Sequence, residues 1–493
     1  MHPNWLFPYL PRPQYPPFPD VLQSSLAWEL VRRTHGGAGL VLQRSSAKRG
    51  EPRFPIHVTS PYADMDGHPS ADGLRPLQQR VNEWDYMASE VLNTEQPEAG
   101  RALIHSLQGV SGRDSTSVAI CPLTPSLARM QDAAGAMGSS GPPDFAAIIR
   151  ALFSIGGPSG QDAVVLWQQA MEERILRFPI LGRIEETATC MMQGLWVERN
   201  QSAPLANHPA PKWLRQAKDT PYSWFHGVWQ SLCVAWPKVL PPRRWTDWTS
   251  AVLRTALGFG YLWEAQFFWS LACHVIRCNE SGADRNASWA LAHRQLFLGA
   301  PPILPWQQNG GSIHRTMRDL VTKGHACRYF ILKALERTQP PRGDSLREAF
   351  DHVADQVSRL PKGEINNLRR AATGQHEAGG LKNYEETIRY ALMARDSGDG
   401  IVDHYGFLKS GRGSDLRIRP SGEWITLIAA LAAGGPTNPC RLDDVQRAVA
   451  QLGLRPRIDV LRLELERAGL AEGSPDGDGG VRVHVPFAME GGR

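Results

Sequence analysis

The sequence predicts a mainly α-helical, multidomain protein, and three observations support this prediction. The chain has 493 residues, which is too long for one compact core. Apolar residues recur at helical spacing for about two hundred residues in the second and third quarters of the chain. Eleven of the sixteen tryptophans lie between residues 196 and 306, a density typical of one large aromatic core.

We expect four segments. They are a proline and aromatic arm over 1–20, an α+β domain with a loop-rich end over 21–155, a helical tryptophan-rich domain over 156–400, and a C-terminal domain over 401–493. The arm contains seven prolines, which favour extended backbone and exclude a helix. Because a free tail is normally more polar, we expect the arm to pack on its own chain, and docking into a partner is the alternative.

The α+β segment has one strongly periodic helix, expected at residues 74–91. Residues 109–160 are rich in Gly, Ser and Pro, which indicates a junction between domains. The other expected elements are helices at 22–33 and 145–153 and strands at 38–43, 55–59 and 118–121.

Eight helices are expected in the tryptophan-rich segment, at 162–177, 184–198, 223–235, 246–278, 288–297, 313–337, 346–360 and 384–395. Three of these helices have, at or shortly before their first position, a residue whose side chain suits a helix cap. These residues are Ser288, Ser312 and Asp344.

Composition excludes several classes of protein. The seven cysteines are scattered and form no C-x-x-C pair, so a reducing compartment is expected rather than a disulfide framework. The longest apolar tract, residues 251–276, holds Arg254, Glu264, Gln266 and His274, whereas a membrane span needs about 20 nearly uncharged residues. We therefore expect a cytoplasmic protein without membrane contact. Basic residues exceed acidic ones by only 54 to 49, which by itself does not imply a nucleic-acid partner.

The C-terminal segment changes character. A short strand at 416–420 precedes Ser421, which suits the cap of a helix at 424–433. Two further helices are expected at 442–452 and 457–468, and residues 471–485 suggest a strand, a glycine-rich turn and a second strand. The predicted order is three short helices followed by a hairpin.

This order resembles the winged helix-turn-helix family over residues 420–487. The resemblance implies that the third helix enters the DNA major groove and that the wing touches the backbone. It thereby implies DNA-contacting roles for Arg457, Arg462, Arg467 and Arg482. Three acidic residues share the third helix and would repel phosphate, so a winged helix used for protein contacts is an equal alternative.

The helix expected at 313–337 is the most basic element. Arg318, His325, Tyr329 and Lys333 share one side and could follow a phosphate backbone. The candidate nucleic-acid-binding residues of this helix are Arg315, Arg318, Lys323, Arg328 and Lys333. A solvated helix face is the alternative.

No specific catalytic signature occurs, so we assign no catalytic residue, cofactor or metal ligand. One loop contains four side chains with oxygen or nitrogen atoms that could bind a metal, namely Asp64, Asp66, His68 and Asp72. Their spacing matches no calcium-binding loop. Acidic residues just before a helix are also favourable to the helix dipole, which accounts for them without a metal. Cys273, His274 and Cys278 share one helix, but no second cluster in the sequence completes a zinc site. Small buried cysteines are the expected outcome there.

The sequence thus favours a non-enzymatic nucleic-acid-binding and scaffolding component of a multi-protein system. A long helical body that ends in such a module is similar to the accessory subunits of bacterial anti-phage defence systems, which implies protein partners from the same system as well as DNA. The alternatives are a protein interaction scaffold that binds no nucleic acid, and a metal-dependent enzyme that uses the Asp64 cluster.

Overall fold

The structure of the protein is a computed structural model. It describes residues 4–13, 22–23, 25–27, 29, 41–44, 56–59, 124–126, 145–158, 160–192, 210–280, 282, 284–297, 302–306, 313–336, 338–341, 343–376, 381–395, 403–410, 416–471 and 481–484. The helix expected at 74–91, the strand expected at 118–121 and the Asp64 cluster lie outside these residues.

The described chain is mainly helical, as the sequence predicts. The helices of the body are α5 (Phe145–Ile155), α6 (Ala163–Arg177), α7 (Pro179–Met192), α8 (Lys212–Gln216), α9 (Pro221–Gln230), α10 (Pro242–Cys278), α11 (Arg285–Phe297), α12 (Ile313–Leu335), α13 (Leu346–Ser358), α14 (Lys362–Ala372) and α15 (Leu381–Leu392). A π-helical turn η2 (Ser231–Ala235) and a 3₁₀ turn η3 (Trp236–Lys238) connect α9 to α10. Strands β1 (Val41–Arg44) and β2 (Ile56–Thr59) pair antiparallel, close to the two positions expected.

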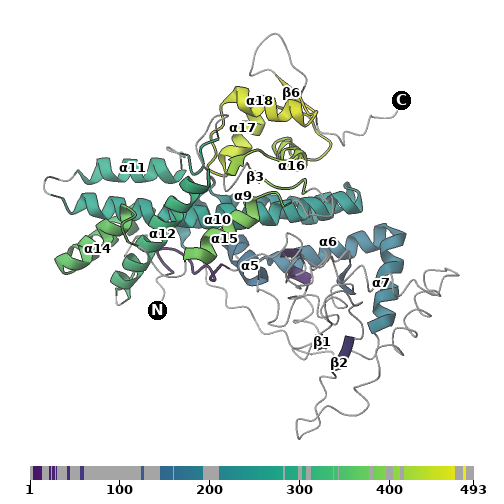
Figure 1. Ribbon diagram of the computed structural model, residues 1–493, viewed down its shortest axis with the longest axis horizontal. Helices are drawn as coiled ribbons and strands as arrows, with labels where there is room; N and C mark the ends of the chain where they lie inside the picture. Colours follow the sequence, from purple (N-terminus) through teal and green to yellow (C-terminus); the bar gives the residue numbers. More distant parts are fainter. Residues whose placement is uncertain are drawn as a thin grey trace, which may run out of the picture.

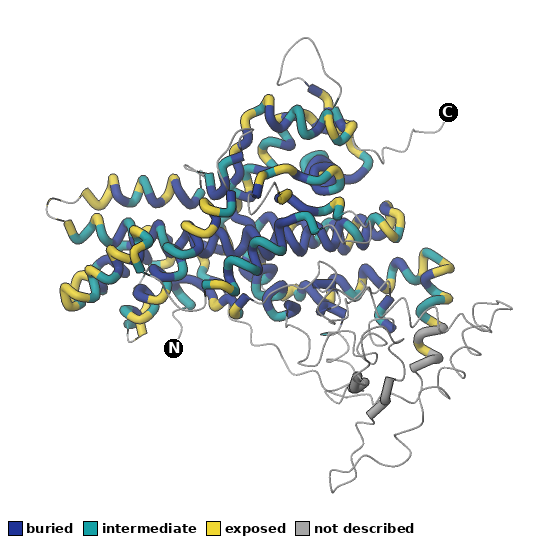
Figure 2. The backbone as a smooth tube through the Cα atoms, in the orientation of Figure 1, coloured by how far each residue is buried: buried dark blue, intermediate teal, exposed yellow. Residues whose placement is uncertain are grey.

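Helix α10 is the centre of the fold. It has 37 residues, which is about 55 Å of helix at 1.5 Å per residue. Figure 1 shows it running through the middle of the molecule with the other helices of the body around it, and Figure 2 shows that it is buried along nearly its whole length. Gly324 lets α12 approach α10 closely, because a Cβ there would lie 2.3 Å from the main-chain oxygen of Ala265. No helix in the described part of the chain is both long and apolar enough to cross a lipid bilayer.

The N-terminal arm packs into this core over residues 4–13. Phe7 is 1% exposed and contacts four aromatic rings, those of Tyr222, Trp263, Phe267 and Phe268. The Tyr261 hydroxyl donates a 2.7 Å hydrogen bond to the main-chain oxygen of Pro11. The prediction that the arm packs on its own chain is confirmed for these residues.

Several helix ends differ from the sequence prediction because local capping decides them. Ser345, not Asp344, caps α13, and it forms a capping box with Glu348. Asp284 accepts hydrogen bonds from the first N–H groups of α11, so this helix begins one turn before Ser288. Helix α14 was not expected, since its sequence is polar and its few apolar residues become buried through packing against α12 and α10.

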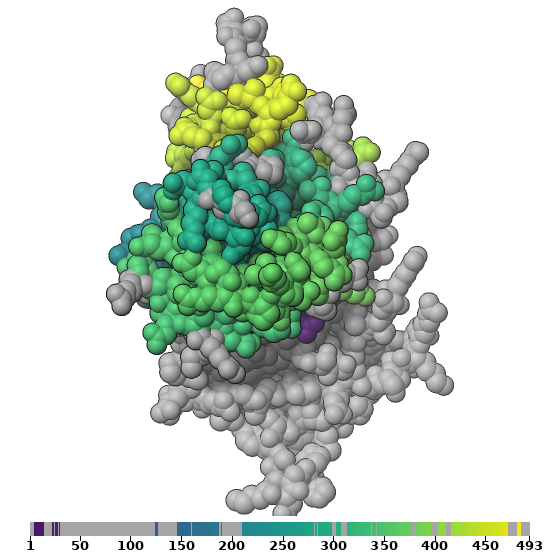
Figure 3. Space-filling model, turned by 90° about the vertical axis from the view of Figure 1, so that its left-hand side faces the viewer, coloured from purple at the N-terminus to yellow at the C-terminus, as the bar shows by residue number. Residues whose placement is uncertain are grey.

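The C-terminal elements lie on the outer side of the body. Strands β3 (Leu408–Ser410) and β4 (Leu416–Ile418) pair with each other, and α16 (Gly422–Ala432), α17 (Leu442–Ala450) and α18 (Ile458–Arg467) follow. The two-residue strands β5 (Cys440–Arg441) and β6 (Arg482–Val483) pair antiparallel, and Ala471 bridges to Val483. Figures 1 and 3 show these elements as one lobe above α10.

Side chains of α16 fix this lobe to α10. The indole of Trp424 is fully buried and donates a 3.0 Å hydrogen bond to the Thr255 hydroxyl. The indole of Trp248 donates to Glu423 at 3.2 Å. The C-terminal lobe and the body therefore share one continuous hydrophobic core.

Candidate functional site

The outer edge of α12 exposes the predicted stripe. Of the four residues expected to share this side, Arg318, Tyr329 and Lys333 are exposed and His325 is half-buried. Arg315, a further candidate one turn before Arg318, is exposed as well. Arg318 lies 3.6 Å from Glu385 and Lys333 lies 3.0 Å from Glu364, so acidic residues of α15 and α14 partly neutralise them. Arg315 has no ion-pair partner among the described residues. The stripe spans roughly 27 Å from Arg315 to Lys333 at 1.5 Å per residue.

Two of the predicted cations on α12 face other helices. Lys323 is mostly buried, contacts Asp319 at 2.6 Å and lies over the ring of Trp269. Arg328 is buried against α10, where its Nε lies 3.3 Å from Glu264 Oε1, and it donates a 3.0 Å hydrogen bond to the Tyr384 hydroxyl. Arg328 therefore contributes to the core and not to the exposed stripe.

Glu264 is a buried carboxyl group inside α10. Burial raises its pKa, and the Arg328 guanidinium opposes this increase. Its Oε1 atom and the Nε atom of Arg328 make no hydrogen bond within the described structure. They line a small cavity of about 10 Å³ that has room for one water molecule.

The arginines predicted on α18 each contact an acidic residue of the same helix. Arg457 makes two 3.0 Å hydrogen bonds to Asp459. Arg462 contacts Glu466 at 2.7 Å, and Arg467 contacts Glu464 at 2.7 Å. The helix and its N-cap therefore carry three positive and three negative charges in neighbouring pairs.

Arg482, the fourth predicted residue of the C-terminal lobe, has a different environment. It is exposed on β6 and lies directly opposite Arg441 of β5. Arg447 of α17 lines the same open depression, which also contains Asp443 and Asp444. The depression therefore carries three arginines and two aspartates, and the two arginines that face each other across β5 and β6 repel each other.

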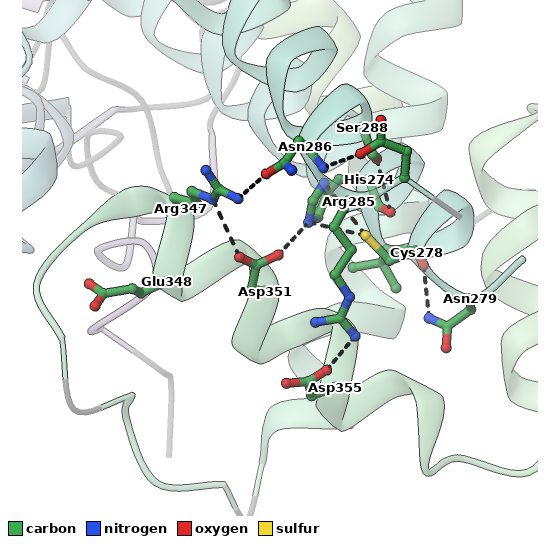
Figure 4. Close-up of polar contacts among 12 residues, drawn as sticks. His274, Cys278, Asn279, Arg285, Asn286, Ser288, Arg347, Glu348, Asp351 and Asp355 are labelled. Carbon is green, nitrogen blue, oxygen red and sulfur yellow. Dashed lines mark hydrogen bonds and ion pairs between the residues drawn. The ribbon is translucent and has the colours of Figure 1, made fainter. Parts of the chain in front are cut away.

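A second group of polar side chains lies where α10 ends. His274 and Cys278 are one turn apart on α10, and Asp351 approaches them from α13 (Figure 4). The Nε2 atom of His274 lies 3.5 Å from Cys278 Sγ and 3.4 Å from Asp351 Oδ1. His274 is fully buried and Asp351 is 29% exposed. Burial lowers the pKa of His274, although Asp351 acts in the opposite direction, and so favours the neutral imidazole.

Neighbouring residues hold this group in place. Arg347 lies 3.7 Å from Oδ2 of Asp351, which leaves Oδ1 directed at His274. Arg347 also donates to Asn286, and Arg285 contacts Asp355 at 2.8 Å (Figure 4). Sequence reasoning found His274 and Cys278 from their spacing but missed Asp351, because only the packing of α13 on α10 brings it near.

The chain matches no protein-family model, and no curated protein is significantly similar to it.

Proposed function

We propose that this protein is a nucleic-acid-binding scaffold, with a helical body that contacts phosphates and a C-terminal winged helix-turn-helix module. The exposed stripe of Arg315, Arg318, Tyr329 and Lys333 on α12 is the observation that carries this proposal. Cations along one helix edge suit a phosphate backbone, and an exposed tyrosine among them can stack on a base.

The order of the C-terminal elements supports the winged-helix part of the proposal. Three helices are followed by β6, whose residue Val483 pairs with both β5 and Ala471. In this proposal α18 is the third helix of the motif, and β6 belongs to the wing.

The ion pairs on α18 shift the proposed phosphate contacts toward other residues. Phosphate would have to displace Asp459 from Arg457, and likewise separate the other two pairs, before these arginines could bind it. We therefore assign the main contribution in this lobe to Arg482, together with Arg441 opposite it.

Salt-dependent binding to a short DNA duplex tests the proposal. Fluorescence anisotropy at several salt concentrations should show micromolar or tighter binding that weakens as salt increases. The changes Arg315→Gln and Lys333→Gln should each reduce the slope of log affinity against log salt by about 0.9, the value for one phosphate contact. Arg294→Gln is the matched control, since Arg294 is exposed on α11, which carries none of the proposed contact residues. Salt-independent binding, or none at micromolar protein, would refute the proposal.

A protein interaction scaffold is the second candidate, and exposed apolar side chains favour it. Leu176 at the end of α6 is 84% exposed and Ile180 at the start of α7 is 60% exposed. The neutral surface of α18 also suits a protein partner. We propose that such partners belong to the same multi-protein system, as in the anti-phage defence complexes that this architecture is similar to. A pull-down should recover a stable complex that Leu176→Asp abolishes.

A further inference from the structure

We infer that His274, Cys278 and Asp351 form a zinc site that fastens α13 to the C-terminal end of α10. The three ligand atoms lie within 4.8 Å of one another and come from two helices that pack together. Imidazole nitrogen, thiolate sulfur and carboxylate oxygen are the three ligand types that zinc takes in proteins.

The two distances from the His274 nitrogen match the edges of a zinc tetrahedron. Typical bonds of about 2.0–2.1 Å to nitrogen, 2.3 Å to sulfur and 2.0–2.2 Å to oxygen place nitrogen and sulfur about 3.5 Å apart, and nitrogen and oxygen about 3.4 Å apart. The observed separations from His274 Nε2 are 3.5 Å to Cys278 and 3.4 Å to Asp351. One atom, Nε2, makes both contacts, as a single metal-bound nitrogen would.

Hydrogen bonding alone does not account for the group. Oδ1 of Asp351 is buried and makes no hydrogen bond in the described structure. Its 3.4 Å separation from His274 exceeds the 2.7–2.9 Å typical of a charge-assisted hydrogen bond. A buried carboxylate oxygen without a donor costs free energy, and a bound cation would remove that cost.

The charges of the group also suit a divalent cation. Zn²⁺ together with one thiolate, one carboxylate and one neutral imidazole has no net charge, so a partly buried site avoids the cost of an isolated ion. Arg347 holds the second oxygen of Asp351 and thereby orients the first toward the metal. With three protein ligands, the fourth position takes a water molecule, which the exposed side of Asp351 can admit.

Cobalt substitution tests the site in the full-length protein. The chain is stripped of metal with a chelator and titrated with Co²⁺, a spectroscopic substitute for zinc. We expect one equivalent to give a thiolate-to-cobalt charge-transfer band, visible bands typical of tetrahedral coordination, and displacement of both by Zn²⁺. Cys278→Ser should abolish the charge-transfer band, while Cys273→Ser, which changes the neighbouring half-buried cysteine on the same helix, should retain it.

The affinity of Zn²⁺ gives the second measurement. Asp351→Asn should weaken binding more than about tenfold, since even the outer partners of metal ligands are worth about 10–100-fold. This variant changes a partly exposed residue by one atom, so it tests the site even where the cysteine variant does not fold. A cobalt spectrum that survives Cys278→Ser, or zinc binding that is unchanged by Asp351→Asn, would overturn the inference, as would the failure of micromolar Co²⁺ to bind.

Discussion

Arg254 and Asp403 form a buried two-point ion pair between the first half of α10 and the segment that leads to the C-terminal lobe. Nη1 contacts Oδ1 and Nη2 contacts Oδ2, both at 2.9 Å. The same guanidinium donates to the main-chain oxygens of Ala391 and Met393, where α15 ends. One arginine thus connects α10, α15 and the start of the C-terminal lobe, and its charge is fully paired.

Removing Asp403 should destabilise the protein strongly. Asp403→Ala leaves the Arg254 charge buried without a counter-ion, and loss of one partner of a buried pair costs about 3–5 kcal/mol. Urea unfolding followed by tryptophan fluorescence measures the change. Asp443→Ala, at an exposed residue of α17, is the control and should change the stability by less than about 0.5 kcal/mol. Equal effects of the two substitutions would contradict a structural role for the pair.

Acid should remove the stability that this pair provides. Burial by itself raises the pKa of Asp403, but the Arg254 guanidinium and the N–H groups of Tyr405 and Arg395 outweigh it and lower the pKa below the ordinary 3.8. The contribution is therefore complete above about pH 4 and is lost as the pH falls through the lowered pKa. The difference in stability between wild type and Asp403→Ala should shrink over this acidic range in urea unfolding experiments. A stability difference between the two proteins that stays constant from pH 7 to pH 3 would contradict the lowered pKa of Asp403.

The polar residues of α10 show what the sequence could and could not predict. Arg254, Glu264 and His274 predicted from the sequence that this apolar tract does not span a membrane, and all three are buried. Their partners, Asp403, Arg328 and Asp351, come from three other segments. A sequence shows that a buried charge needs a partner, but only tertiary packing selects which residue provides it.

The candidate binding surfaces were also only partly predictable from the sequence. Periodicity predicted α12, α17 and α18 and placed Arg318, Tyr329 and Lys333 on one exposed edge. Arg328 was included among the candidate residues because it is a cation of this basic helix, and the sequence does not reveal that it faces Glu264 of α10. The sequence showed that acidic residues share α18 with the arginines, but it did not show that each arginine contacts one acidic residue.

Loss of the Phe7 side chain should show how much the arm contributes to stability. The ring is packed among four aromatic rings of α9 and α10, so Phe7→Ala leaves a cavity and should cost about 3–5 kcal/mol. Leu176→Ala removes a comparable apolar side chain from an 84% exposed position and should have little effect. Chemical denaturation of both variants provides the comparison. A stability of Phe7→Ala close to that of the control would mean that the arm is not part of the core in solution.

The contributions of Glu264 and Arg328 to the free energy of unfolding should be coupled, and a double-mutant cycle measures this coupling. Each single change to Met leaves one buried charge without its partner and should cost about 3–5 kcal/mol. The double change removes both charges and keeps the site apolar, so it should recover most of that loss. Urea unfolding of the four proteins gives the coupling free energy between the two residues. Additive losses would show that the carboxylate and the guanidinium, although 3.3 Å apart, stabilise the core independently.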